Sequence, residues 1–225
     1  MESGGVATWA EHFERERGRY ADGEARLSGL REPDDRQRQL TRMGNAAGGA
    51  GLALLMDGRR DEAAPWFVRA AERYRESFAA APPGSWGRPI GALKARLLAG
   101  DRAGAEDDAR WALAAGARES ASPIGRYAAC LALLVVGEDD MAAREAAGLR
   151  GRDDFPDDVA RTLAAIAAQE QEQYGSAAAD VLCSFEIRHE YLEDLPVADT
   201  VLVFQELAAA RGLGADLRSP LLPAS

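Results

Sequence analysis

Apolar residues recur along this chain at helical spacing. An apolar run at residues 52–56 ends at Gly58, and the segment that follows has apolar residues three and four positions apart, at Ala63, Phe67, Ala70, Tyr74 and Phe78. This spacing places the side chains on one stripe of a helix. The stretch is therefore predicted to form two helices joined by a tight turn at Gly58. Phe67 lies in the middle of the stripe and is predicted to be buried between hairpins.

The same arrangement is repeated along the chain. An apolar run, a turn glycine and an alanine-rich segment follow one another four times, and the turn glycines at 58, 100, 137 and 175 are 42, 37 and 38 residues apart. Periods of this length are typical of arrays of two-helix repeats. Prolines at 123 and 156 fit the first turns of new helices. The pattern predicts an all-α protein, an α-α superhelix in which antiparallel helical hairpins stack as a solenoid.

The repeats are expected to occupy most of one helical-repeat domain, residues 1–225. Three parts are predicted: an N-terminal helix and linker at 6–35, about four hairpins at 36–190, and a capping C-terminal helix with a tail at 191–225. Asp34 or Asp35 is expected to cap the long helix that follows the linker. The final helix is expected to include Val197. Because the last helix of a solenoid needs cover, Leu221 and Leu222 are expected to fold back onto it.

The first long helix contains a glycine-rich stretch at residues 44–51, GNAAGGAG. The stretch resembles a phosphate-binding loop, but it lacks the Gly-Lys-Ser/Thr ending of a P-loop and no strand precedes it. Each helical glycine costs about 1 kcal/mol relative to alanine, so the glycines need a packing reason. We expect them to allow a neighbouring helix to approach closely.

Composition restricts the class of partner and the compartment. The net charge is −10 and Lys94 is the only lysine, so nucleic acid is disfavoured as a partner. No apolar run approaches the roughly 20 residues of a membrane span, and the first residues lack the pattern of a secretory signal. Cys130 and Cys183 are expected to be buried free thiols, which fits a cytoplasmic protein.

No catalytic motif or metal-binding spacing is visible. The two histidines, His12 and His189, lie far apart in the chain, and neither has a second histidine or a cysteine at ligand spacing. Paired acids such as Asp107 and Asp108 lie at turns or helix starts, where they serve as caps. We predict no catalytic residue, no metal and no cofactor. An enzyme whose site is assembled between hairpins, and a scaffold that forms homo-oligomers, stay open as alternatives.

Part of each hairpin resembles a known repeat. The sequence GRRDEAA at residues 58–64, with Phe67, Ala70 and Ala71, resembles the turn and second helix of a tetratricopeptide repeat. The proline near the end of that repeat is matched at positions 82, 123 and 156, whereas the early Trp, Leu and Gly are mostly absent. The resemblance covers residues 36–190. It implies degenerate repeats in which the first helix of each hairpin lines a concave face.

The C-terminal part resembles a second family. Residues 195–196, 207–209, 211–212 and 219–223 are similar to the close of the Immunity protein 49 family. Members of that family are bacterial all-helical proteins thought to neutralise a toxin of a competing cell by binding it. The resemblance implies that the partner of this chain is a toxin.

Charge separates the two helices of each hairpin. Residues 36–56, 77–100 and 120–137, which hold the first helices, contain no Asp or Glu. The candidate partner-binding cations in these stretches are Arg38, Arg42, Arg88, Lys94 and Arg126. A basic concave face inside an acidic shell would steer an acidic peptide segment or protein towards it. The alternative is that these cations pair with acids on the second helices. We predict non-catalytic protein binding, with toxin neutralisation as its specific form.

Overall fold

The computed structural model describes residues 7–224, and within these residues it is all-helical, with no β-strand. The elements in chain order are α1 (Trp9–Leu27), α2 (Pro33–Met56), α3 (Arg60–Phe78), α4 (Gly87–Leu98), α5 (Arg102–Ala114), α6 (Pro123–Val136), α7 (Asp139–Ala147), α8 (Asp157–Ala168), α9 (Gln171–Glu186), the 3-10 helix η1 (Leu192–Asp194) and α10 (Asp199–Ala209). None of the described helices is long and apolar enough to cross a membrane. The predicted all-α fold is confirmed.

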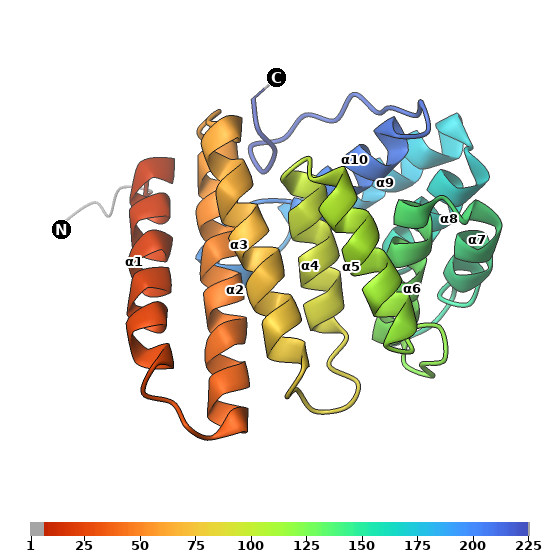
Figure 1. The fold of residues 1–225 in the computed structure, drawn as a ribbon. Helices are drawn as coiled ribbons and strands as arrows, with labels where there is room; N and C mark the ends of the chain where they lie inside the picture. The colour runs from red at the N-terminus through yellow and green to blue at the C-terminus, as the bar shows by residue number, and fades with distance from the viewer. Residues whose placement is uncertain (1–6, 225) are drawn as a thin grey trace.

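Consecutive helices pack against one another in chain order, which gives the superhelical array predicted from the repeats (Figure 1). The hairpins are α2/α3, α4/α5, α6/α7 and α8/α9. Their first helices also contact one another in sequence, α2 with α4, α4 with α6 and α6 with α8, so they form the inner layer. Helix α10 packs back against α4, α8 and α9. The C-terminal helix therefore covers part of the inner layer instead of extending the row.

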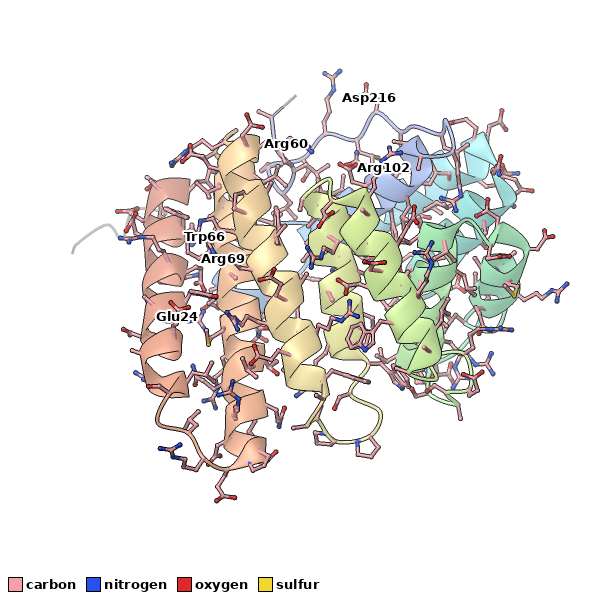
Figure 2. All side chains as sticks on the ribbon, in the orientation of Figure 1. Glu24, Arg60, Trp66, Arg69, Arg102 and Asp216 are labelled. Atoms are coloured by element: carbon pink, nitrogen blue, oxygen red, sulfur yellow. The ribbon has the colours of Figure 1, made fainter. Side chains whose placement is uncertain are left out.

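Helix α1 is part of the array. Thr8 and Glu11 form a capping box at its start, with the Glu11 backbone N–H donating to the Thr8 hydroxyl at 3.3 Å. Its aromatic residues meet Trp66 of α3, whose ring lies edge-on to Phe13 and to Tyr20 at centroid distances of 5.8 and 5.6 Å. Arg69, labelled beside Trp66 in Figure 2, places its guanidinium 4.7 Å from the Trp66 ring. These aromatic contacts attach α1 to the first hairpin.

Three of the four predicted turn glycines make the hairpin turns. Gly58, Gly100 and Gly137 have φ values of 77°, 69° and 79°, in the left-handed region where glycine has no Cβ penalty. The fourth prediction is wrong. Gly175 lies inside α9, and the α8–α9 turn is made six residues earlier by Gln169, which has φ 56°. Gly175 is an ordinary helical residue in an alanine-rich stretch, and a residue other than glycine adopts the left-handed conformation at the turn.

Several helix boundaries also differ from the predicted ones. Ser122 caps α6, accepting from the Gly125 N–H at 3.1 Å, and the predicted Pro123 lies in the first turn of that helix. Helix α2, however, starts at Pro33, so Asp34 and Asp35 lie in its first turn, where negative charge favours the helix dipole. Helix α10 starts at Asp199, so Val197 precedes it.

The expected return of the C-terminal tail is confirmed. The Ala198 N–H donates to the Leu221 carbonyl oxygen at 2.9 Å, and the Leu222 side chain is 7% exposed. In Figure 1 the tail runs back across one end of the helices, from α10 towards the first hairpins. The tail therefore fixes the residue that precedes α10.

Cysteine burial follows the prediction for only one of the two residues. Both thiols are free, but Cys130 is buried in α6 whereas Cys183 is exposed on α9. The expectation for Cys183 is wrong because its apolar sequence neighbours Val181, Leu182 and Phe185 occupy the inward face of that helix. Burial also raises the pKa of the Cys130 thiol, which keeps it protonated at neutral pH.

The glycines of α2 allow the close packing that we expected of them. A Cβ on Gly44 would lie 2.9 Å from the Tyr74 ring, one on Gly49 would lie 2.9 Å from Leu195, and one on Gly51 would lie 2.7 Å from the Phe67 ring. Phe67 is 1% exposed, so its predicted burial is also confirmed. Gly48 differs, because a Cβ there would have only Ala70 nearby, at 3.9 Å.

This difference predicts opposite effects of one substitution at two neighbouring sites. Gly48→Ala should raise the free energy of unfolding by about 0.5–1 kcal/mol, because alanine favours the helix and its methyl group fits. Gly51→Ala should lower it by about 1–3 kcal/mol, because the buried Phe67 ring has to move. Urea denaturation measures both. Since the two variants gain the same helix propensity, equal effects would contradict the packing explanation.

Candidate functional site

A cavity of about 330 Å³ lies between α2, α3 and α4, and the segment from η1 to the start of α10 forms its remaining wall. Most of the lining is apolar, including Leu52, Phe67 and Leu98. Two lining residues are exposed, Gly87 at the start of α4 and Leu192 of η1, the latter 67% exposed. The cavity therefore reaches solvent between the start of α4 and η1.

Small residues create this space. Gly48 and Gly49 of α2 and Gly91 of α4 line the cavity without side chains. The Tyr74 ring of α3 is held between two glycines, because a Cβ on Gly91 would lie 2.7 Å from one ring edge and a Cβ on Gly44 would lie 2.9 Å from the other. The helices approach closely at Tyr74 and leave a gap beside it.

The cavity has a polar end and an apolar end. Thr41 and Arg88 come from the first halves of α2 and α4, whereas Leu52 and Leu98 come from the last turns of these helices. Arg88 Nη2 bonds Gln37 of α2, so the starts of the two helices lie together. Arg88 thus lies towards one end of the lining, and the other end is lined by hydrocarbon.

A chain of hydrogen bonds ties the C-terminal segment to the first three helices. The Tyr74 hydroxyl donates to Asn45 Oδ1 at 2.9 Å, and Asn45 Nδ2 donates to Glu193 Oε1 at 2.9 Å. Arg19 of α1 forms an ion pair with the same Glu193 carboxylate, and Arg15 donates to the Glu193 carbonyl oxygen. Glu193 is therefore the point at which α1, α2 and η1 meet.

The η1 backbone is held in an uncommon conformation. Glu193 and Asp194 have φ values of 57° and 55°, and left-handed residues other than glycine cost about 1–3 kcal/mol each. The contacts of Glu193 offset this cost. Arg19 also pairs with Glu16, whose side chain is 0% exposed, so the same arginine joins a buried carboxylate of α1 to η1.

Lys94 has its counter-ion within the chain. Its ammonium group donates to the Asp199 carboxylate and, at 3.1 Å, to the Thr200 hydroxyl. These bonds hold the start of α10 against α4. Lys94 lines the cavity as predicted for a residue of the inner face, but its charge is already matched.

Arg88 lines the cavity with neutral partners. Its Nε donates to the Ser77 hydroxyl at 3.1 Å and its Nη2 donates to Gln37 Oε1. Within residues 7–224 no Asp or Glu forms an ion pair with it, and burial lowers the pKa of Arg88 because its charge is partly removed from water. Its guanidinium has five N–H donors, and two are used by these bonds. Arg88 can therefore receive an anion.

The other three predicted cations lie outside the cavity lining. Arg38 is exposed and pairs with Asp34 one turn earlier in α2, and Arg42 is exposed one turn later. Arg126 Nη1 lies 3.3 Å from a carboxylate oxygen of Glu145 on α7. The structure thus brings Arg38 and Arg42 to the same end of the array as Arg88, whereas Arg126 pairs with the second helix of its own hairpin.

Two further ion pairs agree with the alternative, in which the first-helix cations pair with acids on the second helices. Arg36 of α2 lies 2.9 Å from Glu76 of α3, and Arg96 of α4 lies 3.2 Å from the buried Asp108 of α5. Pairing of first-helix cations with second-helix acids therefore accounts for part of the charge pattern. It does not account for Arg88 among the described residues.

Sequence reasoning missed the polar residues that build this site. Asn45, Glu193 and Asp199 were not singled out as site residues, although Asn45 is a polar residue within a small-residue face predicted to be covered. A polar group on a covered face requires hydrogen-bond partners, and this requirement is the one sequence signal that could have identified Asn45. Its partner Glu193 is 148 positions away, so no local pattern pointed to it.

The histidines do not contribute to the cavity. His12 is buried in α1, where burial and the nearby Arg15 lower its pKa, and His189 is exposed. Across residues 7–224 no three His, Cys, Asp or Glu side chains are grouped so that they could hold a metal ion.

Comparison with other proteins gives no assignment. No family model matches the chain, and neither a curated protein nor a solved structure shows significant similarity to it. The resemblances to tetratricopeptide repeats and to Immunity protein 49 therefore stay predictions, and the site has to be interpreted from its own chemistry.

Two tyrosines, the partly buried Tyr74 and the buried Tyr174, predict opposite effects of one conservative substitution. Tyr74 donates to Asn45, whereas the Tyr174 hydroxyl in α9 is buried with no hydrogen-bond partner among the described residues. Tyr74→Phe should lower the free energy of unfolding by about 1–3 kcal/mol, because Asn45 loses its partner. Tyr174→Phe should leave it unchanged or raise it by about 1 kcal/mol. Denaturant titration of both variants measures this, and a larger loss for Tyr174→Phe would contradict the proposed network.

Alkaline pH should destabilise the fold. Burial raises the pKa of Tyr74, with the Glu193 carboxylate adding to the effect, and burial raises the pKa of Tyr174 to about 12. In the unfolded chain tyrosine titrates near pH 10. The folded state therefore binds more protons above this pH, and the free energy of unfolding should fall from about pH 10 upwards. Thermal melts between pH 8 and 12 measure the decline, which Tyr174→Phe should reduce. A melting temperature that stays constant to pH 12 would contradict this burial.

Proposed function

We propose that this protein acts without catalysis, by binding a partner protein or acidic peptide segment at the basic end of its inner layer. The observation that carries the proposal is Arg88, a half-buried cation at the rim of a largely apolar cavity, with no carboxylate partner among the described residues. An unmatched arginine at such a position favours a partner that supplies the carboxylate, because charge-assisted bonds strengthen away from water.

The charged residues near Arg88 support this end of the array as the contact surface. Arg42 is exposed on α2 and forms no ion pair among the described residues, and Arg38, one turn earlier and next to Gln37, is exposed and paired with Asp34. The chain as a whole has a net charge of −10. A small basic region on an acidic protein orients an approaching acidic partner, which raises the association rate and reduces binding elsewhere on the surface.

The specific form that we propose is neutralisation of a toxin in the cytoplasm. It rests on the similarity of residues 195–223 to the close of the Immunity protein 49 family. Part of that segment, Leu195, lies at the cavity wall and packs against Gly49 of α2. One residue of the segment that carries the resemblance therefore lies at the wall of the cavity that Arg88 also lines.

The first experiment tests partner binding. The immobilised protein is exposed to secreted and cytoplasmic fractions of competing bacteria, and a captured protein is purified and mixed with it in stopped flow. The double variant Arg38→Glu/Arg42→Glu should slow association at least tenfold at low salt, because both charges are exposed and steer the partner. The wild-type association rate should fall as salt is added.

The matched control is Arg126→Glu. It reverses one charge of the same type, but at a residue that pairs with Glu145 on α7. It should lower the melting temperature while leaving the association rate within about twofold of wild type, because local repulsion replaces an ion pair. If Arg126→Glu slows association as much as the double variant, the basic end is not the contact surface. If the captured protein is harmless when expressed alone, the toxin form is wrong.

A further inference from the structure

We propose that the cavity binds a small free monocarboxylate, a molecule with one carboxylate and an apolar body. The cavity site shares Arg88 with the proposed partner-protein surface but includes neither Arg38 nor Arg42. It is inferred from the difference between the two ends of the lining. Arg88 lies at one end, and hydrocarbon from Leu52, Phe67 and Leu98 lines the other.

The charge of the ligand follows from Arg88. Ser77 and Gln37 fix the guanidinium through Nε and Nη2, and both partners are uncharged. The bonds orient the plane of the guanidinium and leave Nη1 without a partner among the described residues. A carboxylate can accept from a guanidinium through two oxygens, so it fits this position better than a neutral acceptor.

The apolar body follows from how the other polar groups of the lining are used. Tyr74, Asn45 and Glu193 bond one another, and Lys94 bonds Asp199. These groups offer few unsatisfied donors or acceptors to a ligand. A peptide that entered the cavity would leave its own amides unpaired, and each such loss weakens binding. A molecule with a single polar group does not have this cost.

Size and orientation follow from the shape of the cavity. A volume of about 330 Å³ is at the lower end of the range for ligand pockets, so the ligand is small. The opening lies beside exposed Gly87, the residue before Arg88. The carboxylate should therefore lie near the opening, with the apolar body directed towards Phe67 and Leu98.

Octanoate is the probe for this site, with 1-octanol and octylamine as uncharged and cationic analogues of the same length. Isothermal titration calorimetry on the full chain should detect octanoate binding, and each analogue should bind at least tenfold more weakly. Arg88→Gln should weaken octanoate binding at least tenfold while leaving octanol binding within about twofold. Arg42→Gln is the matched control, because it removes an exposed charge of α2 outside the lining, and it should change octanoate binding less than threefold.

A second variant tests the cavity without touching the charge. Gly48→Leu adds a side chain where a Cβ meets only Ala70, at 3.9 Å, so it should fill the cavity and abolish octanoate binding while the far-ultraviolet circular dichroism stays helical. Gly175→Leu, at an open position of α9, is its control and should bind octanoate as wild type does.

The following outcomes would overturn the proposal. If octanoate does not bind at millimolar concentration, the cavity is not a carboxylate site. If octanoate and octanol bind equally, or if Arg42→Gln weakens octanoate binding as much as Arg88→Gln does, Arg88 does not recognise the carboxylate. Tighter binding of a leucine-terminated peptide than of octanoate, lost on amidation, would assign the cavity to a polypeptide terminus instead. Arg38→Glu/Arg42→Glu should retain octanoate binding within about threefold, so failure of partner binding and failure of this site are distinguishable.

Discussion

The lack of side-chain volume along α2 is the constraint on which the rest of the structure depends. Tyr74, Phe67 and Leu195 each occupy space that a Cβ on a glycine of α2 would take. Helical glycines destabilise the isolated helix by about 1 kcal/mol each, so α2 is stable only through the groups packed on it. Those groups come from α3 and from the C-terminal segment. Helix α2 is therefore stabilised by parts of the chain that follow it.

The same constraint limits which part of the inner layer a partner can reach. Helix α10 covers α4 and α8, and Lys94 and Asp199 form an ion pair at its start. The chain thus occupies part of its own concave face. The N-terminal ends of α2 and α4, where Arg88 lies, and the cavity behind it include exposed residues. Both proposals therefore concern one end of the array and share Arg88, but only the partner surface includes Arg38 and Arg42.

The cations of the first helices show why local charge composition does not identify a binding site. Arg126 and Lys94 come from equally acid-free stretches as Arg88, yet each finds a carboxylate on another element. Arg88 finds only Ser77 and Gln37. The cost of removing the Arg88 charge from water is thus not offset by an internal carboxylate. This difference, rather than the number of arginines, distinguishes Arg88 from Arg126 and Lys94.

The sequence by itself determined the helices, the hairpins and the burial of Phe67, because helical periodicity and turn glycines act over a few neighbouring residues. It failed at Gln169, where a non-glycine residue takes the left-handed turn conformation. Only the tertiary structure decided the bond between Asn45 and Glu193, the return of α10 over the inner layer, and the cavity. These features join residues more than 100 positions apart, and which groups meet at that range depends on how the helices pack, which no local pattern specifies.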